Sequence, residues 1–152
     1  MRRLAIALLL FAALDAAACE CGKRWPVEKQ FAEAPIVFVG RVERIHDRWT
    51  LLAKMRQWFR KDANVWQHYC DDYGVEVTFT VSESWKGVSS RRITIVTGRG
   101  GGDCGVEFKD GVEYVVYAYP PGHDGCQTNI CTRTREVAYA GDDLAFLRRQ
   151  KG

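Results

Sequence analysis

Six cysteines, at positions 19, 21, 70, 104, 126 and 131, constrain this chain more than any other feature. The count is even, and a chain of 152 residues has room for about one domain. So many cysteines in a small domain are typical of a disulfide framework formed in an oxidising compartment. Six cysteines can pair in many ways, and spacing alone does not choose among them.

The first residues predict such a compartment. Arg2 and Arg3 precede an apolar run over 4–14, and alanines fill 16–18. This is the pattern of a secretory signal peptide, and the run is too short to span a membrane. We expect a signal peptide over 1–18 and one mature domain over 19–152, secreted to an extracellular or periplasmic space. Lipidation of Cys19 is the alternative, which would anchor a lipoprotein.

Composition and motifs argue against several function classes. The chain is 47% hydrophobic, which excludes disorder, and its net charge of +3 is too small to indicate nucleic acid. His46, His68 and His123 lack the spacing of a zinc-ligand motif. A formal G-x-G-x-x-G match begins at Gly100, but a strand rather than a helix is expected after it. We therefore expect no enzymatic activity, no cofactor, no nucleic-acid partner and a monomeric state.

The mature sequence is patterned mainly as strands. Alternation and β-branched runs predict strands over 36–45, 75–85, 92–97 and 112–119, with a bulge or bend at Gly40. The Asp-Gly turn at 110–111 predicts that Glu107-Phe108 pairs with the last of these, and 129–133 is a candidate short strand. Asp142 or Asp143 is expected to cap a C-terminal helix. Some five strands and a terminal helix predict a small barrel, closed or partly open.

Residues 46–74 interrupt this pattern. The stretch 48–60 predicts a helix with Trp49, Leu52, Met55 and Phe59 along one side and basic residues elsewhere. We favour a cap over one end of the barrel, tied to the domain through Cys70. The alternative is a basic amphipathic helix that contacts a membrane surface or a partner.

The motif Cys19-Glu20-Cys21 would open the mature chain. In an extended segment two cysteines separated by one residue point the same way, so Glu20 would project in the opposite direction. Disulfides from both cysteines would hold a chain end that normally frays, which suggests that the terminus itself is used. The alternative is that both bonds are only structural.

The sequence resembles the tissue inhibitors of metalloproteinases, in their N-terminal netrin-like domain and its bacterial relatives. The resemblance spans 19–147 and is carried by Cys19-Glu20-Cys21, Phe31, Ala34, Ile36-Val37-Phe38, Gly40, Val42, Ser84-Trp85-Lys86-Gly87, Asp103-Cys104-Gly105 and Cys131. It implies a mainly β fold, a five-stranded OB-fold barrel with the helical insertion 46–74 between its first two strands. It also implies the disulfides Cys19–Cys104 and Cys21–Cys131, which leaves Cys70–Cys126 as a pair particular to this chain.

The resemblance further implies inhibition of a zinc metalloprotease. The amine and carbonyl of Cys19 would chelate the zinc of the protease, and Glu20 would enter the adjoining specificity pocket. The protease contacts would come from Cys19, Glu20, Cys21, Gly22, Asp103, Cys104 and Gly105. Inhibitors usually carry a small or uncharged residue where this chain has Glu20. The alternative function is a non-inhibitory netrin-like binding module that uses the basic aromatic segment 48–66.

Overall fold

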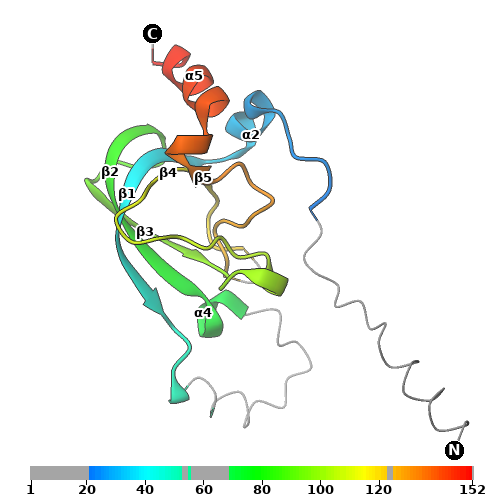
Figure 1. Cartoon of the computed structure of the whole chain (residues 1–152), viewed down its shortest axis with the longest axis vertical. Coiled ribbons are helices and arrows are strands. Elements are labelled where there is room, and N and C mark those ends of the chain that lie inside the picture. Colours follow the sequence, from blue (N-terminus) through cyan, green and yellow to red (C-terminus); the bar gives the residue numbers. More distant parts are fainter. Residues whose placement is uncertain (1–20, 53–54, 56–68, 123–124, 152) are drawn as a thin grey trace, which may run out of the picture.

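The computed structural model describes residues 21–52, 55, 69–122 and 125–151. The predicted mainly β class is confirmed, since one antiparallel sheet has the strand order β3-β2-β1-β4-β5 (Figure 1). The strands are β1 Ile36–Asp47, β2 Val75–Lys86, β3 Arg92–Thr97, β4 Glu113–Ala118 and β5 Arg135–Glu136. The helices are α2 Val27–Glu33, α4 Tyr69–Tyr73, η3 Gly101–Asp103, η4 Val137–Tyr139 and α5 Gly141–Arg149.

The long strand β1 organises both hydrophobic cores. Phe38 and Val42 on one of its faces join Phe79 of β2 and other side chains in the core within the curved sheet. Val37 and Val39 on the other face pack in a second core beneath α2 and α5, which lie side by side at one end of the sheet (Figure 1). Residues 37–40 of β1 are apolar and buried on both faces, whereas residues 43–47 are exposed.

The predicted bend at Gly40 is confirmed. The register between β1 and β2 shifts between Val39 and Gly40. A Cβ atom at Gly40 would lie 3.1 Å from the carbonyl oxygen of Thr80 and 3.1 Å from the ring of Phe38. A side chain there would require its neighbours to shift by a few tenths of an ångström, so glycine suits this close approach of the strands.

The sheet is open, since its edge strands β3 and β5 do not pair within the described residues. A short segment nevertheless joins β3 to the end of β4. The Gln127 amide donates to the Val96 carbonyl at 2.8 Å, and the Tyr119 amide donates to the Gln127 carbonyl at 2.9 Å. An isolated parallel bridge links Thr97 to Thr128. The fold is therefore barrel-like only in a loose sense.

Two strand predictions are wrong. Glu107-Phe108 is not a strand, because residues after the Asp-Gly turn pair with β1 instead: Val42 donates to the Val112 carbonyl at 2.9 Å and Gly111 to the Val42 carbonyl at 3.0 Å. Residues 129–133 form a turn rather than a strand. The Asn129 carboxamide oxygen accepts from the Cys131 amide at 2.9 Å, which stabilises that turn, and β5 begins only afterwards.

The predicted C-terminal helix exists, but its predicted cap does not. The N-cap residue of α5 is Ala140, and it makes no side-chain capping bond. Asp143 is fully buried and accepts instead from Arg133 Nε at 2.6 Å and from the Tyr117 hydroxyl at 3.0 Å. A buried carboxylate needs such compensation, and the contacts tie α5 to β4.

Candidate functional site

The disulfides fix the N-terminal segment of the described chain. Cys21 is bonded to Cys131 with a Cα–Cα distance of 5.2 Å, and Cys70 is bonded to Cys126 at 5.1 Å, so both predicted pairs are confirmed. Cys104 is also disulfide-bonded. Cys19 and Glu20 lie outside the described residues, so the Cys19–Cys104 pair and the proposed roles of both residues stay predictions.

The described site residues come from two separate segments that are linked through one turn. Cys21 and Gly22 precede α2, whereas Asp103, Cys104 and Gly105 lie in the loop 98–105. The disulfide joins Cys21 to Cys131, and the neighbouring Ile130 amide donates to the Cys104 carbonyl at 2.9 Å. The turn at 130–131 therefore connects the N-terminal segment to the loop that the resemblance assigns to the same contact surface.

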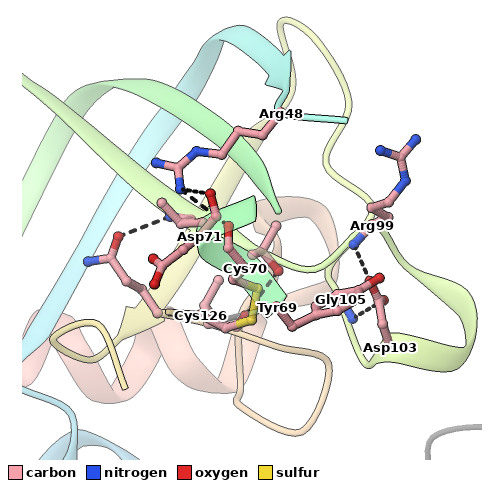
Figure 2. Close-up of a disulfide and its surroundings, with 12 residues drawn as sticks. Arg48, Tyr69, Cys70, Asp71, Arg99, Asp103, Gly105 and Cys126 are labelled. Carbon is pink, nitrogen blue, oxygen red and sulfur yellow. Dashed lines mark hydrogen bonds between the residues drawn. A yellow bond between two sulfur atoms is a disulfide. The ribbon is translucent and has the colours of Figure 1, made fainter. Parts of the chain in front are cut away.

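The carboxylate of Asp103 organises the loop 98–105. It accepts hydrogen bonds from the backbone amides of Arg99 at 2.6 Å, Gly100 at 2.9 Å and Gly105 at 3.0 Å. A fourth bond comes from the Tyr69 hydroxyl at 3.0 Å, and Figure 2 shows Asp103 among these groups. A short carboxylate that accepts from several local amides stabilises a loop, here around the single turn of η3. Asp103 thus has a structural role inside the loop, whatever the loop contacts.

Burial and these hydrogen bonds shift the pKa values of Asp103 and Tyr69. Desolvation opposes ionisation of Asp103, but the bonds from Arg99, Gly105, Tyr69 and Gly100 outweigh it, so the Asp103 pKa lies below 3.8. Desolvation, together with the hydrogen bond to Asp103, raises the pKa of Tyr69 to about 12. Tyr69 therefore remains a hydrogen-bond donor at neutral pH, and Asp103 remains an ionised acceptor.

The loop also needs its small residues. Cys104 has a left-handed backbone with φ of 62°, which is uncommon for a residue with a side chain. A Cβ atom at Gly105 would overlap the backbone of Gly98. The sequence Asp103-Cys104-Gly105 therefore combines an amide-binding carboxylate, a strained cysteine and a close backbone approach. These contacts explain why these three residue types stand at 103–105, which their spacing in the sequence alone does not show.

The ends of the insertion 46–74 are fixed beside this loop, at the opposite end of the sheet from α2 and α5 (Figure 1). Arg48 Nε donates to the Glu76 carboxylate at 3.0 Å, and its Nη1 donates to the carbonyls of Cys70 and Asp71 at 3.2 Å (Figure 2). The disulfide to Cys126 then ties α4 to the segment between β4 and β5. The expected attachment through Cys70 is confirmed.

The expected cap over a barrel end stays a prediction, because most of 48–60 lies outside the described residues. Leu51, Leu52 and Met55 are helical, but they are 74%, 67% and 51% exposed. Trp49 is 38% exposed and packs on Tyr73, with ring centroids 4.8 Å apart. The described start of the segment therefore exposes apolar side chains that the predicted cap would bury.

No family model matches this chain, and no curated protein matches it. The class that the fold defines is therefore a disulfide-bonded, mainly β domain with an open five-stranded sheet. The described residues hold no group of three His, Cys, Asp or Glu side chains that could bind a metal ion. Among them, no helix is long and apolar enough to cross a bilayer.

The low pKa of Asp103 predicts a specific pH response of the loop. Its folded pKa lies below the reference value of 3.8, so the stabilisation is complete above that value and is lost as pH falls through the folded pKa. The amide shifts of Gly100 and Gly105, followed by NMR, should titrate together with a midpoint below 3.8. The variant Asp103→Asn should lack this titration. A wild-type midpoint at or above 3.8 would contradict the hydrogen-bonding account.

Proposed function

We propose that the mature protein is a secreted inhibitor of a zinc metalloendopeptidase, similar to the tissue inhibitors of metalloproteinases. One observation supports this most strongly: the turn at 130–131 holds both the Cys21 segment, through a disulfide, and the Cys104 carbonyl, through a 2.9 Å hydrogen bond. The two segments that would contact a protease are therefore both attached to this turn. The disulfides are compatible with an extracellular or periplasmic location.

The proposed chemistry uses the free amine of Cys19. A catalytic zinc keeps an open coordination position that a water normally fills. An α-amine has a pKa of about 8, so an appreciable fraction is neutral near pH 7, and zinc favours that form. The amine and carbonyl of Cys19 would displace the water and chelate the metal.

Rigidity is the contribution of the described residues to this mechanism. The Cys21–Cys131 bond joins positions separated by 110 residues. In the chain-entropy model, a loop of that size lowers the free energy of the folded relative to the unfolded state by about 4–5 kcal/mol. A segment that is ordered before binding loses little further conformational entropy when it binds.

Glu20 narrows the proposed targets. Burial of an unpaired carboxylate in an apolar pocket is costly. A protease whose adjoining specificity pocket contains an arginine or lysine would compensate the charge, whereas an apolar pocket would not. We therefore propose a metalloendopeptidase with a basic pocket as the target class.

An added alanine before Cys19 should abolish inhibition, because it moves the free amine away from the zinc and replaces it with a peptide nitrogen. Inhibition constants would be measured against a panel of zinc metalloendopeptidases with basic and apolar specificity pockets. The matched control carries one alanine after Gly152 and should inhibit like the unmodified protein. Undiminished potency of the N-terminal extension would contradict the chelation mechanism.

A second candidate function is a binding module that acts through the segment 48–66. The specific observation in its favour is the exposure of Leu51 and Leu52, at 74% and 67%. Neighbouring apolar side chains in water are a feature of surfaces that contact a partner or a membrane. The sequence of the segment is basic, which favours an anionic surface.

The double variant Leu51→Ser/Leu52→Ser should bind anionic lipid vesicles at least about tenfold more weakly, because each leucine contributes apolar burial on membrane contact. Vesicle sedimentation measures the partition coefficient. Tyr139→Ser is the matched control, since Tyr139 is also 74% exposed but lies in η4. Equal partition of the double variant and the unmodified protein would exclude this surface.

A further inference from the structure

A cavity of about 300 Å³ lies between the N-terminal segment and the turn 129–132. The Cys21–Cys131 disulfide forms part of its wall, and Trp25, which is 41% exposed, forms another part. A cavity of this size, with apolar walls and a few polar groups, is typical of a site for a small ligand or for one side chain of a partner.

The buried floor of the cavity presents a hydroxyl with an available proton. Gln30 is only 3% exposed, and its Nε2 donates to the Tyr119 hydroxyl oxygen at 2.8 Å. Because that oxygen accepts this bond, the Tyr119 proton is free to be donated elsewhere. Burial raises the pKa of Tyr119, so the hydroxyl keeps its proton at neutral pH.

A second donor comes from Asn129 in the cavity wall. The Asn129 Oδ1 accepts from the backbone amides of Cys131 at 2.9 Å and Thr132 at 3.2 Å. These two bonds define the orientation of the carboxamide, so its oxygen faces the turn. The Nδ2 group makes no hydrogen bond with any residue that the structure describes, and it remains available as a donor.

One cationic side chain lines the cavity. Lys23 lines it, and Arg24 and Lys29 belong to the same short stretch of chain. None of the three forms a salt bridge with the described residues. Lys29 lies over the ring of Trp25, with its ammonium 4.2 Å from the ring centroid. Lys23 is therefore an unpaired cation in the lining among the described residues and favours an anionic ligand, while the carboxylate of Glu33 acts electrostatically on the Tyr119 hydroxyl.

We propose that this cavity binds a carboxylate carried by a peptide of a partner protein. The ammonium of Lys23, the hydroxyl of Tyr119 and the Nδ2 of Asn129 donate to the carboxylate oxygens, and Trp25 packs on the methylene groups that carry it. Backbone amides of the peptide offer donors to the Gln30 Oε1, which has no partner among the described residues. The inference does not rest on protease inhibition, since no part of it uses Cys19, the loop 98–105 or a zinc ion.

Three small probes test the proposal on the full disulfide-bonded protein. N-acetyl-glutamate N-methylamide carries a side-chain carboxylate, N-acetyl-glutamine carries a terminal one, and N-acetyl-glutamine N-methylamide is the uncharged match of both. NMR titration would follow the side-chain amides of Gln30 and Asn129. At least one carboxylate probe should bind about tenfold more tightly than the uncharged probe, because charge-assisted hydrogen bonds are stronger than neutral ones. The tighter of the two identifies the source of the carboxylate.

Substitutions distinguish the effect of the proposed hydrogen-bond donors on affinity from a general effect of surface charge. Lys23→Met and Tyr119→Phe should each weaken the preferred carboxylate probe by about fivefold or more and reduce its advantage over the uncharged probe. Arg91→Met, which removes an exposed charge before β3 that does not line the cavity, should change binding by less than about twofold. Equal affinity for all three probes, no shift at Gln30 and Asn129, or an unaltered preference in Lys23→Met would each overturn the proposal.

Discussion

The Cys21–Cys131 disulfide is the constraint on which the candidate site depends. A chain end normally frays, yet this bond places the segment before α2 against a turn more than one hundred positions further along the sequence. The same turn holds the loop 98–105, because the Ile130 amide donates to the Cys104 carbonyl. The N-terminal segment, the loop and the carboxylate-binding cavity therefore share one rigid element.

The rest of the fold supports that element from both ends of the sheet. At one end, Asp143 in α5 accepts hydrogen bonds from the Tyr117 hydroxyl of β4 and from Arg133. These bonds hold α5 against β4 and against the region 126–134 that follows it. Arg133 Nη1 also donates to the Trp25 carbonyl at 3.1 Å, so the same arginine helps to fix the N-terminal segment. At the other end, the Cys70–Cys126 disulfide ties α4 to that region. Long-range bonds thus replace regular secondary structure around the site.

The alternation of apolar and polar residues along the sequence predicted the longer strands of the fold. The alternation from Val75 onward and the run at 92–97 identified β2 and β3, and the resemblance supplied the pairs that include Cys131 and Cys126. The Asp-Gly turn forms, with the Val112 amide donating to the Lys109 carbonyl, but Gly111 and Val112 bond to Val42 of β1 and Glu107-Phe108 is not a strand. The contact between Tyr69 and Asp103 joins positions 34 residues apart, and no periodicity reports it. The cavity escaped prediction for the same reason, since tertiary structure assembles its donors.

The central claim is that a disulfide-anchored N-terminus carries the function, and mass spectrometry of the secreted protein tests it most directly. A non-reducing proteolytic digest should yield peptides that join Cys21 to Cys131 and Cys70 to Cys126, together with a mature chain that begins at Cys19 with an unmodified amine. A lipid on Cys19, a mature chain that begins elsewhere, or a free thiol at Cys21 would contradict the account.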